Sequence, residues 1–336
     1  MAKRFFEAEC IRGLETFAAN ELKKAGAKFD ESSVLSGRIR FRFGKSFQRL
    51  KSLRVVSQVF EVYHFDIPRP KALLGSQNYR HLLNILGSAV QQLDQANLDS
   101  FRLEAAGRDS AVFQRLIQSL QNDLGLKHVP DSGELFIRVV PALNRRGWEV
   151  LVRQTDRPLS ARSWRQFNYK GALAGPVAAV MLEIAKINPD DLVLNLMSGS
   201  GTLLADNQQS DGGQFGIDLN ANALKGAMQN LSAAKKTANL AESDATKMPF
   251  GDDMFDVLFS DLPWGQLVGE INQIQQLYPA VLAESWRVAK SGCRFVVITQ
   301  LKKQMHSALN SSNWQLAREI PLKMDRVNPN IYLLKK

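Results

Sequence analysis

The sequence predicts an α/β protein with a mostly parallel, doubly wound sheet in its second half and mixed α+β modules before it. From Pro176 onward, strand-like and helix-like segments alternate regularly, and such alternation builds a parallel sheet with helices on both faces. An apolar run over 191–197 leads directly into a glycine-rich turn. Because ligands of such sheets bind beyond the carboxyl ends of the strands, the polar residues that follow the predicted strands are the candidate site.

The second half supports this prediction element by element. Each expected strand is a short apolar run, and each expected helix carries apolar residues at helical spacing. The expected helices cover residues 177–187, 221–236 and 273–289, and the expected strands cover residues 191–197, 214–219, 255–259, 294–299, 314–321 and 330–334.

The first half mixes strands and helices less regularly. Its clearest strand covers residues 37–43, where Arg38, Arg40 and Arg42 alternate with apolar residues. The three arginines fit two interpretations equally well, an RNA-facing stripe or a solvated face of a sheet. The other expected strands are 5–10, 101–106, 136–140 and 148–155, the expected helices are 13–25, 78–93 and 111–124, and segments 47–52 and 55–65 continue the mixed pattern.

Length and charge indicate two or three domains with different partners. The chain has 336 residues, 45% of them hydrophobic, and a net charge of +10. Residues 1–170 carry 28 Lys and Arg against 17 Asp and Glu, whereas residues 171–336 carry 15 against 16. This asymmetry favours a module that binds a polyanion beside a nearly neutral module, although a basic surface can also serve solubility alone.

Several classes of protein are disfavoured by what the chain lacks. We find no apolar stretch near the roughly 18 residues of a membrane span, no basic amphipathic helix with a bulky apolar face and no signal peptide. We therefore expect a cytoplasmic protein without membrane association. Cys10 and Cys293 are far apart, and the four histidines are scattered, so we expect neither a disulfide framework nor a metal site.

The glycine-rich turn covers residues 197–202, which read Met-Ser-Gly-Ser-Gly-Thr. Gly199 and Gly201 permit positive φ and let backbone N–H groups approach a ligand. Asp218 and Asp244 follow the next two strand-like runs, and a carboxylate in the place of Asp218 can accept both hydroxyls of a ribose. Each carboxylate taken singly is better explained as a helix cap or loop residue, but their order along the chain favours a nucleotide-like cofactor. The spacing matches neither Gly-x-Gly-x-x-Gly nor a P-loop.

A second polar motif covers residues 260–265, Ser-Asp-Leu-Pro-Trp-Gly, directly after the strand predicted at 255–259. The carboxylate of Asp261 and nearby backbone carbonyls can accept hydrogen bonds from an exocyclic amine. Pro263 shapes the turn and removes a competing donor, and the indole of Trp264 can stack on a base. The alternative is an ordinary turn with a solvent-facing Asp and a core Trp, which the upstream motifs disfavour.

In this order, the motifs resemble the S-adenosylmethionine-dependent methyltransferases that modify exocyclic amino groups. The nearest resemblance is to THUMP-containing RNA methyltransferases of the tRNA (guanine-N2) type, whose turn reads Met-Cys-Gly-Ser-Gly-Thr. It covers nearly the whole chain and is strongest over 160–300. Asn195 and Ser198 depart from the family, which usually has an acidic residue and Cys there. The resemblance also includes Arg12-Gly13-Leu14-Glu15 with Glu21-Leu22, residues 160–165 with 171–173, and Leu277-Tyr278-Pro279 with Leu282, Glu284, Arg287 and Val288.

This resemblance implies a domain plan and a cofactor. A ferredoxin-like module would cover 1–65, a THUMP domain 66–156 and a linker 157–170, followed by a Rossmann-like methyltransferase domain over 171–336 with a mostly parallel seven-stranded sheet. S-adenosyl-L-methionine would be held by Asn195, Met197, Ser198, Gly199, Ser200, Gly201, Thr202, Asp218, Leu219, Asp244, Ala245 and Asp261.

The resemblance also implies a reaction, methylation of the N2 amine of a guanosine in tRNA, with position 6 of the acceptor stem favoured. Asp261, Pro263 and Trp264 would form the catalytic loop, and we expect a monomer that needs no metal and does not act on DNA. The alternatives are a ribosomal RNA guanine, an adenine amine, a protein substrate, or an RNA-binding protein with an inactive methyltransferase domain. The candidate RNA contacts are Arg138, Arg145, Arg146, Arg153, Arg162 and Arg165.

Overall fold

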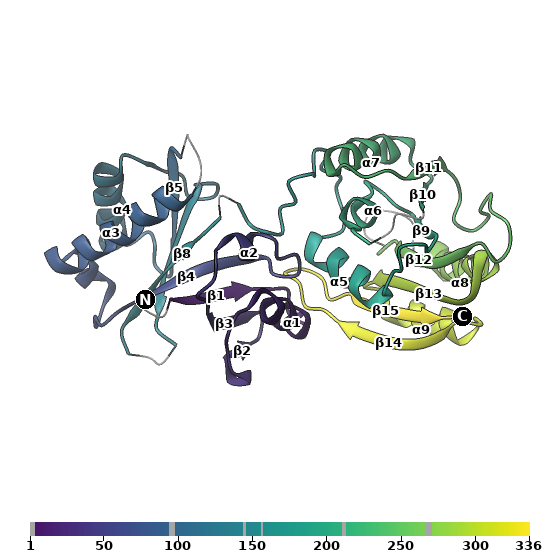
Figure 1. Ribbon diagram of the computed structural model, residues 1–336, viewed down its shortest axis with the longest axis horizontal. Helices are drawn as coiled ribbons and strands as arrows, with labels where there is room; N and C mark the ends of the chain where they lie inside the picture. The colour runs from purple at the N-terminus through teal and green to yellow at the C-terminus, as the bar shows by residue number, and fades with distance from the viewer. Residues whose placement is uncertain (1–3, 94–97, 144–145, 156, 210–212, 266–270) are drawn as a thin grey trace. The chain divides into compact units, whose positions relative to one another are not determined.

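The computed structural model describes residues 4–93, 98–143, 146–155, 157–209, 213–265 and 271–336 (Figure 1). The contacts within the chain divide it into two units. The first comprises residues 1–10 and 18–159, and the second comprises 11–17 and 160–336. The segment expected as a linker, 157–170, therefore lies mostly in the second unit. Each unit is built around its own sheet.

The first unit contains an eight-stranded sheet in the order β2-β3-β1-β4-β8-β7-β5-β6. One continuous sheet thus includes strands from both regions expected as separate modules. Its parallel pairs are β5 with β6 and with β7, and its other pairs are antiparallel. The strands are β1 (Phe5–Glu9), β2 (Val34–Leu35), β3 (Arg38–Arg42), β4 (Gln58–Phe65), β5 (Ser100–Ala105), β6 (Lys127–His128), β7 (Leu135–Pro141) and β8 (Trp148–Arg153).

Side chains alternate between the two faces of this sheet along each strand, and helices cover one of these faces. Leu86 of α3 and Leu120 of α4 are fully buried in one apolar cluster with Ile137 and Val150 of the sheet. The alternate residues point to the opposite face. The helices assigned wholly or partly to this unit are α1 (Glu15–Ala25), which spans the division between the units, α2 (Gln48–Lys51), α3 (Ser76–Gln92) and α4 (Ala111–Leu124).

The opposite face carries a ladder of arginines and glutamates. Arg40 lies opposite Glu7 in the β1–β3 register and donates to its carboxylate at 2.8 Å, while its Nη2 bonds Glu149 at 2.6 Å. Glu7 is completely buried. Arg102 stacks on the Phe136 ring at 3.6 Å. Arg40 therefore pairs across strands, which neither the RNA-facing nor the solvated interpretation anticipated.

The second unit contains a seven-stranded sheet in the order β11-β10-β9-β12-β13-β15-β14. β11, β10, β9, β12 and β13 pair in parallel, and β15 is antiparallel to both β13 and β14. The sheet is therefore mixed. The strands are β9 (Val193–Leu196), β10 (Gln214–Asp218), β11 (Asn239–Glu242), β12 (Phe255–Asp261), β13 (Ala289–Thr299), β14 (Gln315–Pro321) and β15 (Asn330–Lys335).

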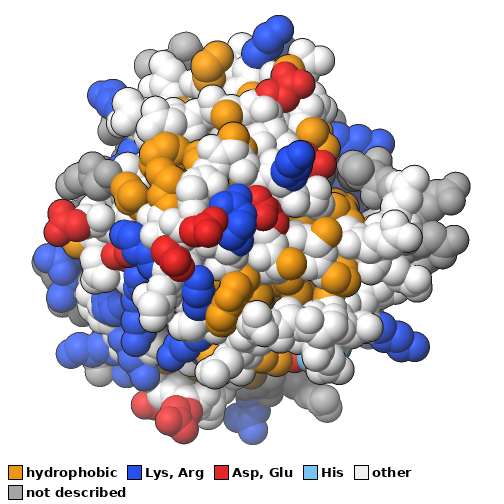
Figure 2. Space-filling model, turned by 90° about the vertical axis from the view of Figure 1, so that its right-hand side faces the viewer, with side chains coloured by type: hydrophobic (Ala, Val, Ile, Leu, Met, Phe, Trp, Pro, Cys, Tyr) orange, Lys and Arg blue, Asp and Glu red, His pale blue; other side chains and the backbone are white. Residues whose placement is uncertain are grey.

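In the part of this unit that the structure describes, five helices flank the sheet. Leu194 and Leu196 of β9 belong to an apolar cluster with Tyr278 of α8 and Met305 of α9, so the intervening Asn195 faces the other side of the sheet. Figure 2 shows one face of this unit, where side chains of both charges are mixed near the centre, in keeping with the nearly balanced charge of residues 171–336. The helices are α5 (Gly175–Ala185), α6 (Thr202–Asp206), α7 (Ala221–Ala234), α8 (Ile271–Val288) and α9 (Lys302–Asn310).

No helix among the described residues is both long enough and apolar enough to span a membrane.

Candidate active site

The two motifs meet where the strand order of the second sheet reverses. From β9 the chain moves outward to β10 and β11, then returns to the other side of β9 with β12 and β13. Asn195 pairs with Phe259 and Leu196 with Ser260, so the turn after β9 and the loop after β12 leave the sheet side by side. Such a switch point is where doubly wound sheets bind their ligands.

The turn after β9 has a conformation that depends on its glycines. Gly199 has φ +53° and Gly201 has φ +73°, which L side chains rarely adopt. A Cβ at Gly201 would lie 3.0 Å from the Cβ of Ala227 on α7. Met197 also has a positive φ of 52°, a strained value for a non-glycine residue that is found mostly at functional sites. The turn ends at Thr202, the first residue of α6.

Four buried oxygen atoms around this turn and β12 have no hydrogen-bond partner among the described residues. They are Oδ1 of Asn195 and the Oγ atoms of Ser198, Ser200 and Ser260. An unpaired buried polar group costs about 1–3 kcal/mol. Ser260 pairs with Leu196 in the β9–β12 register and therefore lies on the face of the sheet opposite Asn195. The oxygens of Asn195, Ser198 and Ser200 lie at or directly before the glycine-rich turn and indicate a site for a polar ligand there. The amino-acid part of S-adenosylmethionine fits this demand because its ammonium group donates hydrogen bonds.

Asp218 ends β10 and is held by its neighbours. Its Oδ2 accepts a 2.8 Å hydrogen bond from the Gly199 N–H, and its Oδ1 accepts one of 2.8 Å from the Asn220 N–H. The Asn220 side chain caps α7. Leu219, between them, is 67% exposed. The carboxylate thus lies beside the glycine-rich turn, with an exposed apolar side chain next to it.

Asp244 follows β11 on an exposed loop, and Ala245 beside it is buried. The carboxylate accepts 2.8 Å hydrogen bonds from the N–H and hydroxyl of Thr246. The N–H of Ser243 donates to the Asp218 carbonyl at 3.1 Å. This contact joins the carboxyl ends of β10 and β11, so the Asp218 and Asp244 segments share one edge of the sheet.

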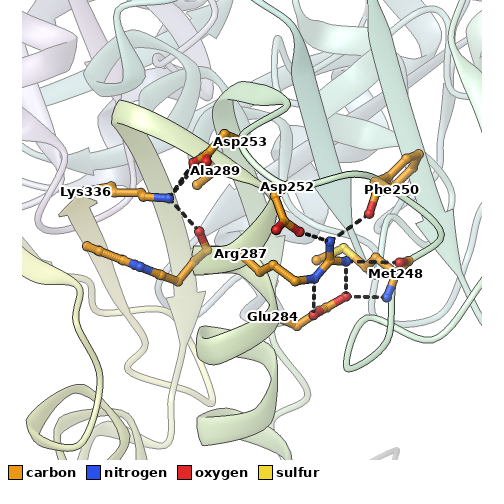
Figure 3. Close-up of polar contacts among 9 residues, drawn as sticks. Met248, Phe250, Asp252, Asp253, Glu284, Arg287, Ala289 and Lys336 are labelled. Atoms are coloured by element: carbon orange, nitrogen blue, oxygen red, sulfur yellow. Dashed lines mark hydrogen bonds and ion pairs between the residues drawn. The ribbon is translucent and has the colours of Figure 1, made fainter.

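A clasp fixes the segment that follows Asp244 (Figure 3). Arg287 of α8 donates to the carbonyls of Met248 and Phe250 and to the carboxylates of Asp252 and Glu284. Its hydrogen bond to Glu284 lowers the pKa of that carboxyl. Lys336 bonds the carboxylate of Asp253 and the carbonyls of Trp286 and Ala289. Glu284 and Arg287 of α8, which are part of the family resemblance in the sequence, thus have a structural role.

Asp261 is the last residue of β12, and its carboxyl accepts a hydrogen bond from Trp264 in the loop that follows. Trp264 donates from Nε1 to Asp261 Oδ1 at 3.0 Å. Asp261 keeps partial exposure, but protein atoms enclose its carboxyl, and this loss of hydration raises the pKa of Asp261 to about 7, opposed by the bond from Trp264. A carboxyl with such a pKa is poised to exchange a proton near neutral pH.

Backbone contacts hold the rest of this loop. The hydroxyl of Tyr278 donates to the Pro263 carbonyl at 2.7 Å and lies 2.7 Å from Thr299 Oγ1. Gln300 donates to the Trp264 carbonyl at 3.0 Å. Tyr278 is completely buried. Within the described part of the chain, no donor reaches the carbonyl of Leu262, so this carbonyl can accept a hydrogen bond from a substrate.

Two arginines predicted to contact RNA in the first unit have partners within the protein. Arg153 is 4% exposed and donates to the carbonyls of Thr155 and Glu134 at 2.8 and 3.0 Å. Arg138 pairs with Glu9 and Glu104.

The other four predicted arginines differ in their surroundings. Arg162 pairs with Asp206 at 3.1 Å, and Arg165 donates to the Leu173 carbonyl and Thr202 Oγ1. Arg146 is exposed between β7 and β8. Arg145 lies outside the described residues. These placements give Arg138, Arg153, Arg162 and Arg165 structural roles, and RNA contact by any of the six stays a prediction.

Sequence reasoning gave no individual role to three residues that lie in or support this site. Ser260 was quoted in the motif without a role, yet it carries one of the four unpaired oxygens. Tyr278 entered only through the resemblance, and Asn230 of α7 was not singled out. The contacts of Tyr278 and Asn230 join segments far apart in sequence, so no local signal could have found these two roles. Among the described residues, no three His, Cys, Asp or Glu side chains are grouped as a metal ion would require.

The fold and the polar cradle at its switch point define a methyltransferase of the S-adenosylmethionine-dependent class. Segments 162–207 and 205–329, which together span half of the chain, match the family described as UPF0020, RMKL-like, methyltransferase domain. The protein belongs to this family.

Two archaeal proteins resemble the chain over most of its length, and a third relative matches about half of it. The tRNA (guanine(6)-N2)-methyltransferase of Methanocaldococcus jannaschii is 22% identical, over 96% of this chain and 97% of the relative. That of Archaeoglobus fulgidus is 25% identical, over 94% and 88%. The U6 snRNA (guanine-N(2))-methyltransferase THUMPD2 of Mus musculus is 31% identical, but the match spans 52% of this chain and 31% of the relative.

Solved structures show the same fold. The crystal structure of TrmN from Thermus thermophilus superposes with a TM-score of 0.72 at 21% identity, over 99% of both chains. The crystal structure of the protein SMU.472 in complex with SAH superposes with a TM-score of 0.71 at 14% identity. The superposition covers 99% of this chain and 98% of SMU.472.

Proposed function

We propose that the protein transfers a methyl group from S-adenosylmethionine to the N2 amine of a guanosine in tRNA, at position 6 of the acceptor stem. Both archaeal relatives that align over most of the chain are named tRNA (guanine(6)-N2)-methyltransferases. The observation that carries the proposal is the Asp261 carboxyl, enclosed at the switch point and tied to Trp264.

The cofactor would lie along the glycine-rich turn. The unpaired oxygens of Asn195, Ser198 and Ser200 would accept hydrogen bonds from its amino-acid part, and Asp218 would accept its ribose hydroxyls. Leu219 and Ala245 would flank the adenine, with Asp244 at the rim. The other contacts of this cradle would come from Met197, Gly199, Gly201, Thr202 and Asp261.

The protein's own groups would align and deprotonate the substrate amine. S-adenosylmethionine supplies an electrophilic methyl group on a sulfonium. Asp261 and the Leu262 carbonyl would accept the two N2 hydrogens of guanine, which directs the nitrogen lone pair toward the methyl carbon. As the N–C bond forms and the S–C bond breaks, Asp261 takes the proton that leaves N2. Alignment supplies most of the acceleration.

The base would reach this loop after leaving its stack in the RNA. Unstacking costs a few kcal/mol, which a ring stacked on the base helps to offset. The Trp264 indole is suited to this because its N–H bond to Asp261 sets the orientation of the ring relative to the carboxylate. Pro263 rigidifies the loop between the two groups.

The first unit would hold the RNA. We propose that it combines the ferredoxin-like and THUMP modules and that its excess of basic residues contacts tRNA phosphates. Because phosphate contacts release counterions, we expect the affinity for tRNA to fall steeply with salt. We further propose that the enzyme acts as a monomer in the cytoplasm and does not use DNA.

The test is incubation of the purified protein with unmodified tRNA transcripts and S-adenosylmethionine, followed by nucleoside mass spectrometry. N2-methylguanosine in the fragment that contains position 6 supports the proposal. An Asp261→Ala variant should retain tRNA affinity and lose turnover. Absence of methylated nucleoside despite tRNA binding contradicts the proposal and favours an inactive methyltransferase domain.

One other substrate has an observation in its favour. The relative with the highest identity among those named above, 31%, acts by its name on U6 snRNA. Parallel reactions with U6 snRNA, ribosomal RNA fragments and tRNA would separate the candidates. N6-methyladenosine in any digest would instead point to an adenine amine.

A further inference from the structure

Asn230 on α7 joins two segments that lie far from it in sequence. The residue is completely buried. Its Oδ1 accepts hydrogen bonds from the N–H groups of Gln166 and Phe167, both at 2.9 Å. Its Nδ2 donates to the carbonyl of Phe167 at 3.2 Å and to that of Ser200 at 3.0 Å. One side chain therefore satisfies backbone groups of the 160–170 segment and of the glycine-rich turn.

The 160–170 segment is anchored to α7 at further points. A Cβ on Gly226, one turn before Asn230, would lie 2.1 Å from Cδ1 of Phe167, so glycine leaves the room that the ring occupies. Tyr169 accepts a 3.3 Å hydrogen bond from Asn220. Its Cδ1 lies 4.0 Å from the position of a Cβ on Gly199. The segment thus lies against the turn that would hold the cofactor.

Two arginines attach the same segment to α6, which begins at the end of that turn. Arg165 donates to Thr202 Oγ1 at 3.1 Å, and Arg162 pairs with Asp206 at 3.1 Å. Both side-chain contacts end on the helix that follows the glycine-rich turn. A change in the position of the segment therefore changes the support of the turn from both α6 and α7.

We propose that Asn230 is a positioning residue that makes the 160–170 segment and the glycine-rich turn one cooperative unit, so that cofactor binding and docking of this segment strengthen each other. The inference rests on the proposed use of S-adenosylmethionine. The hydrogen bond to the Ser200 carbonyl orients the peptide between Ser200 and Gly201. This peptide belongs to the glycine-rich turn along which the cofactor would lie. Coupling of this kind is reciprocal, because each partner favours the same arrangement.

The variants separate the two halves of the Asn230 contact. Asn230→Ala removes all four hydrogen bonds. Asn230→Asp keeps the two acceptor contacts to the 160–170 segment and loses both donor contacts, to the carbonyls of Phe167 and Ser200. Asn207→Ala is the control, since Asn207 is also buried and hydrogen-bonded, through Gln214 and the Gln209 N–H, at the opposite end of α6 from the turn.

The measurements need no RNA. Calorimetry with S-adenosylhomocysteine gives the affinity, and limited trypsin digestion reports cleavage after Arg162, Arg165 and Lys170. We expect both Asn230 variants to bind S-adenosylhomocysteine about tenfold more weakly or worse, whereas Asn207→Ala binds like the wild type. We expect the ligand to slow cleavage of this segment in the wild type and to have little effect in Asn230→Ala. Circular dichroism confirms folding, and Asn230→Asp serves if Asn230→Ala does not fold.

Each other outcome overturns a distinct statement. Wild-type affinity in folded Asn230 variants, or cleavage of the wild type that ignores the ligand, overturns the role of Asn230 and leaves the proposed function intact. Failure of the wild type to bind S-adenosylhomocysteine overturns the use of the cofactor and, with it, this inference. Equal loss of affinity in Asn207→Ala shows a general structural effect and also overturns the inference.

Discussion

Trp264 donates a hydrogen bond from its indole Nε1 to Oδ1 of Asp261, three residues before it, at 3.0 Å. The bond occupies one carboxylate oxygen and leaves the other for a substrate amine. It also lowers the pKa of a carboxyl that enclosure raises. The aromatic residue of the loop therefore acts on the acidity of the carboxyl in addition to any contact with a base.

The pH dependence of methyl transfer should report this bond. Asp261 must be ionised to accept the amine hydrogens, so we expect the rate to rise with pH and level off above about 7. Trp264→Phe keeps an aromatic ring but removes the N–H that lowers the pKa of Asp261. The rise of the rate with pH should therefore occur at higher pH in this variant. Single-turnover rates between pH 5.5 and 9 check both points. If the rate rises at the same pH in the wild type and the variant, the indole N–H does not influence the Asp261 carboxyl.

Asp261→Asn should be inactive and more stable. The folded-state pKa of Asp261 is raised above its unfolded value, so the native carboxyl loses stability as the pH rises from about 4 to about 7. The neutral amide avoids that loss. We expect the variant to gain about 1–3 kcal/mol in the free energy of unfolding at pH 8, with little gain at pH 4. Urea titrations at both pH values measure the difference, and a gain that is independent of pH would contradict the explanation.

Tyr278→Phe should impair turnover more than cofactor binding. The variant keeps the buried ring and removes the hydroxyl that donates to the Pro263 carbonyl. We expect a loss of about 1–2 kcal/mol in the free energy of unfolding and a fall in kcat at nearly unchanged affinity for S-adenosylhomocysteine. Tyr332→Phe is the control, because Tyr332 is equally buried in the same apolar cluster. Equal effects of the two substitutions would remove the special role of Tyr278.

Arg40→Ala should destabilise the first unit rather than weaken RNA binding selectively. Removal of the guanidinium leaves Glu7 buried without this partner and releases Glu149. Breaking a buried pair costs about 3–5 kcal/mol, and the partial exposure of Arg40 places the expected loss near the lower end. Thermal unfolding measures it, with Arg42→Ala, an exposed neighbour on the same strand, as the control. A stable Arg40→Ala protein with reduced tRNA affinity would restore the RNA-facing interpretation.

Several elements could be predicted from local patterns. The helix expected at 177–187 is α5 (Gly175–Ala185), and the terminal strands expected at 314–321 and 330–334 are β14 and β15 within one residue. These segments have strong periodicity or long apolar runs. β13 begins at Ala289, five residues earlier than expected, because Lys290–Cys293 gives no apolar signal although it extends the strand. The short helix α9 was not predicted, since it begins with Lys302 and Lys303 and is largely polar.

The sequence alone determined the order of the glycine-rich turn, Asp218, Asp244 and the Asp261 loop, because each follows a strand whose apolar run is a local property. Tertiary structure decided which groups these motifs meet. The pKa of Asp261 depends on enclosure by atoms distant in sequence. The Pro263 carbonyl accepts a hydrogen bond from Tyr278, and the Ser200 carbonyl in the glycine-rich turn accepts one from Asn230. The Arg–Glu ladder depends on strand register. Such contacts join residues tens of positions apart, and only the packed sheet and helices bring them within hydrogen-bond distance.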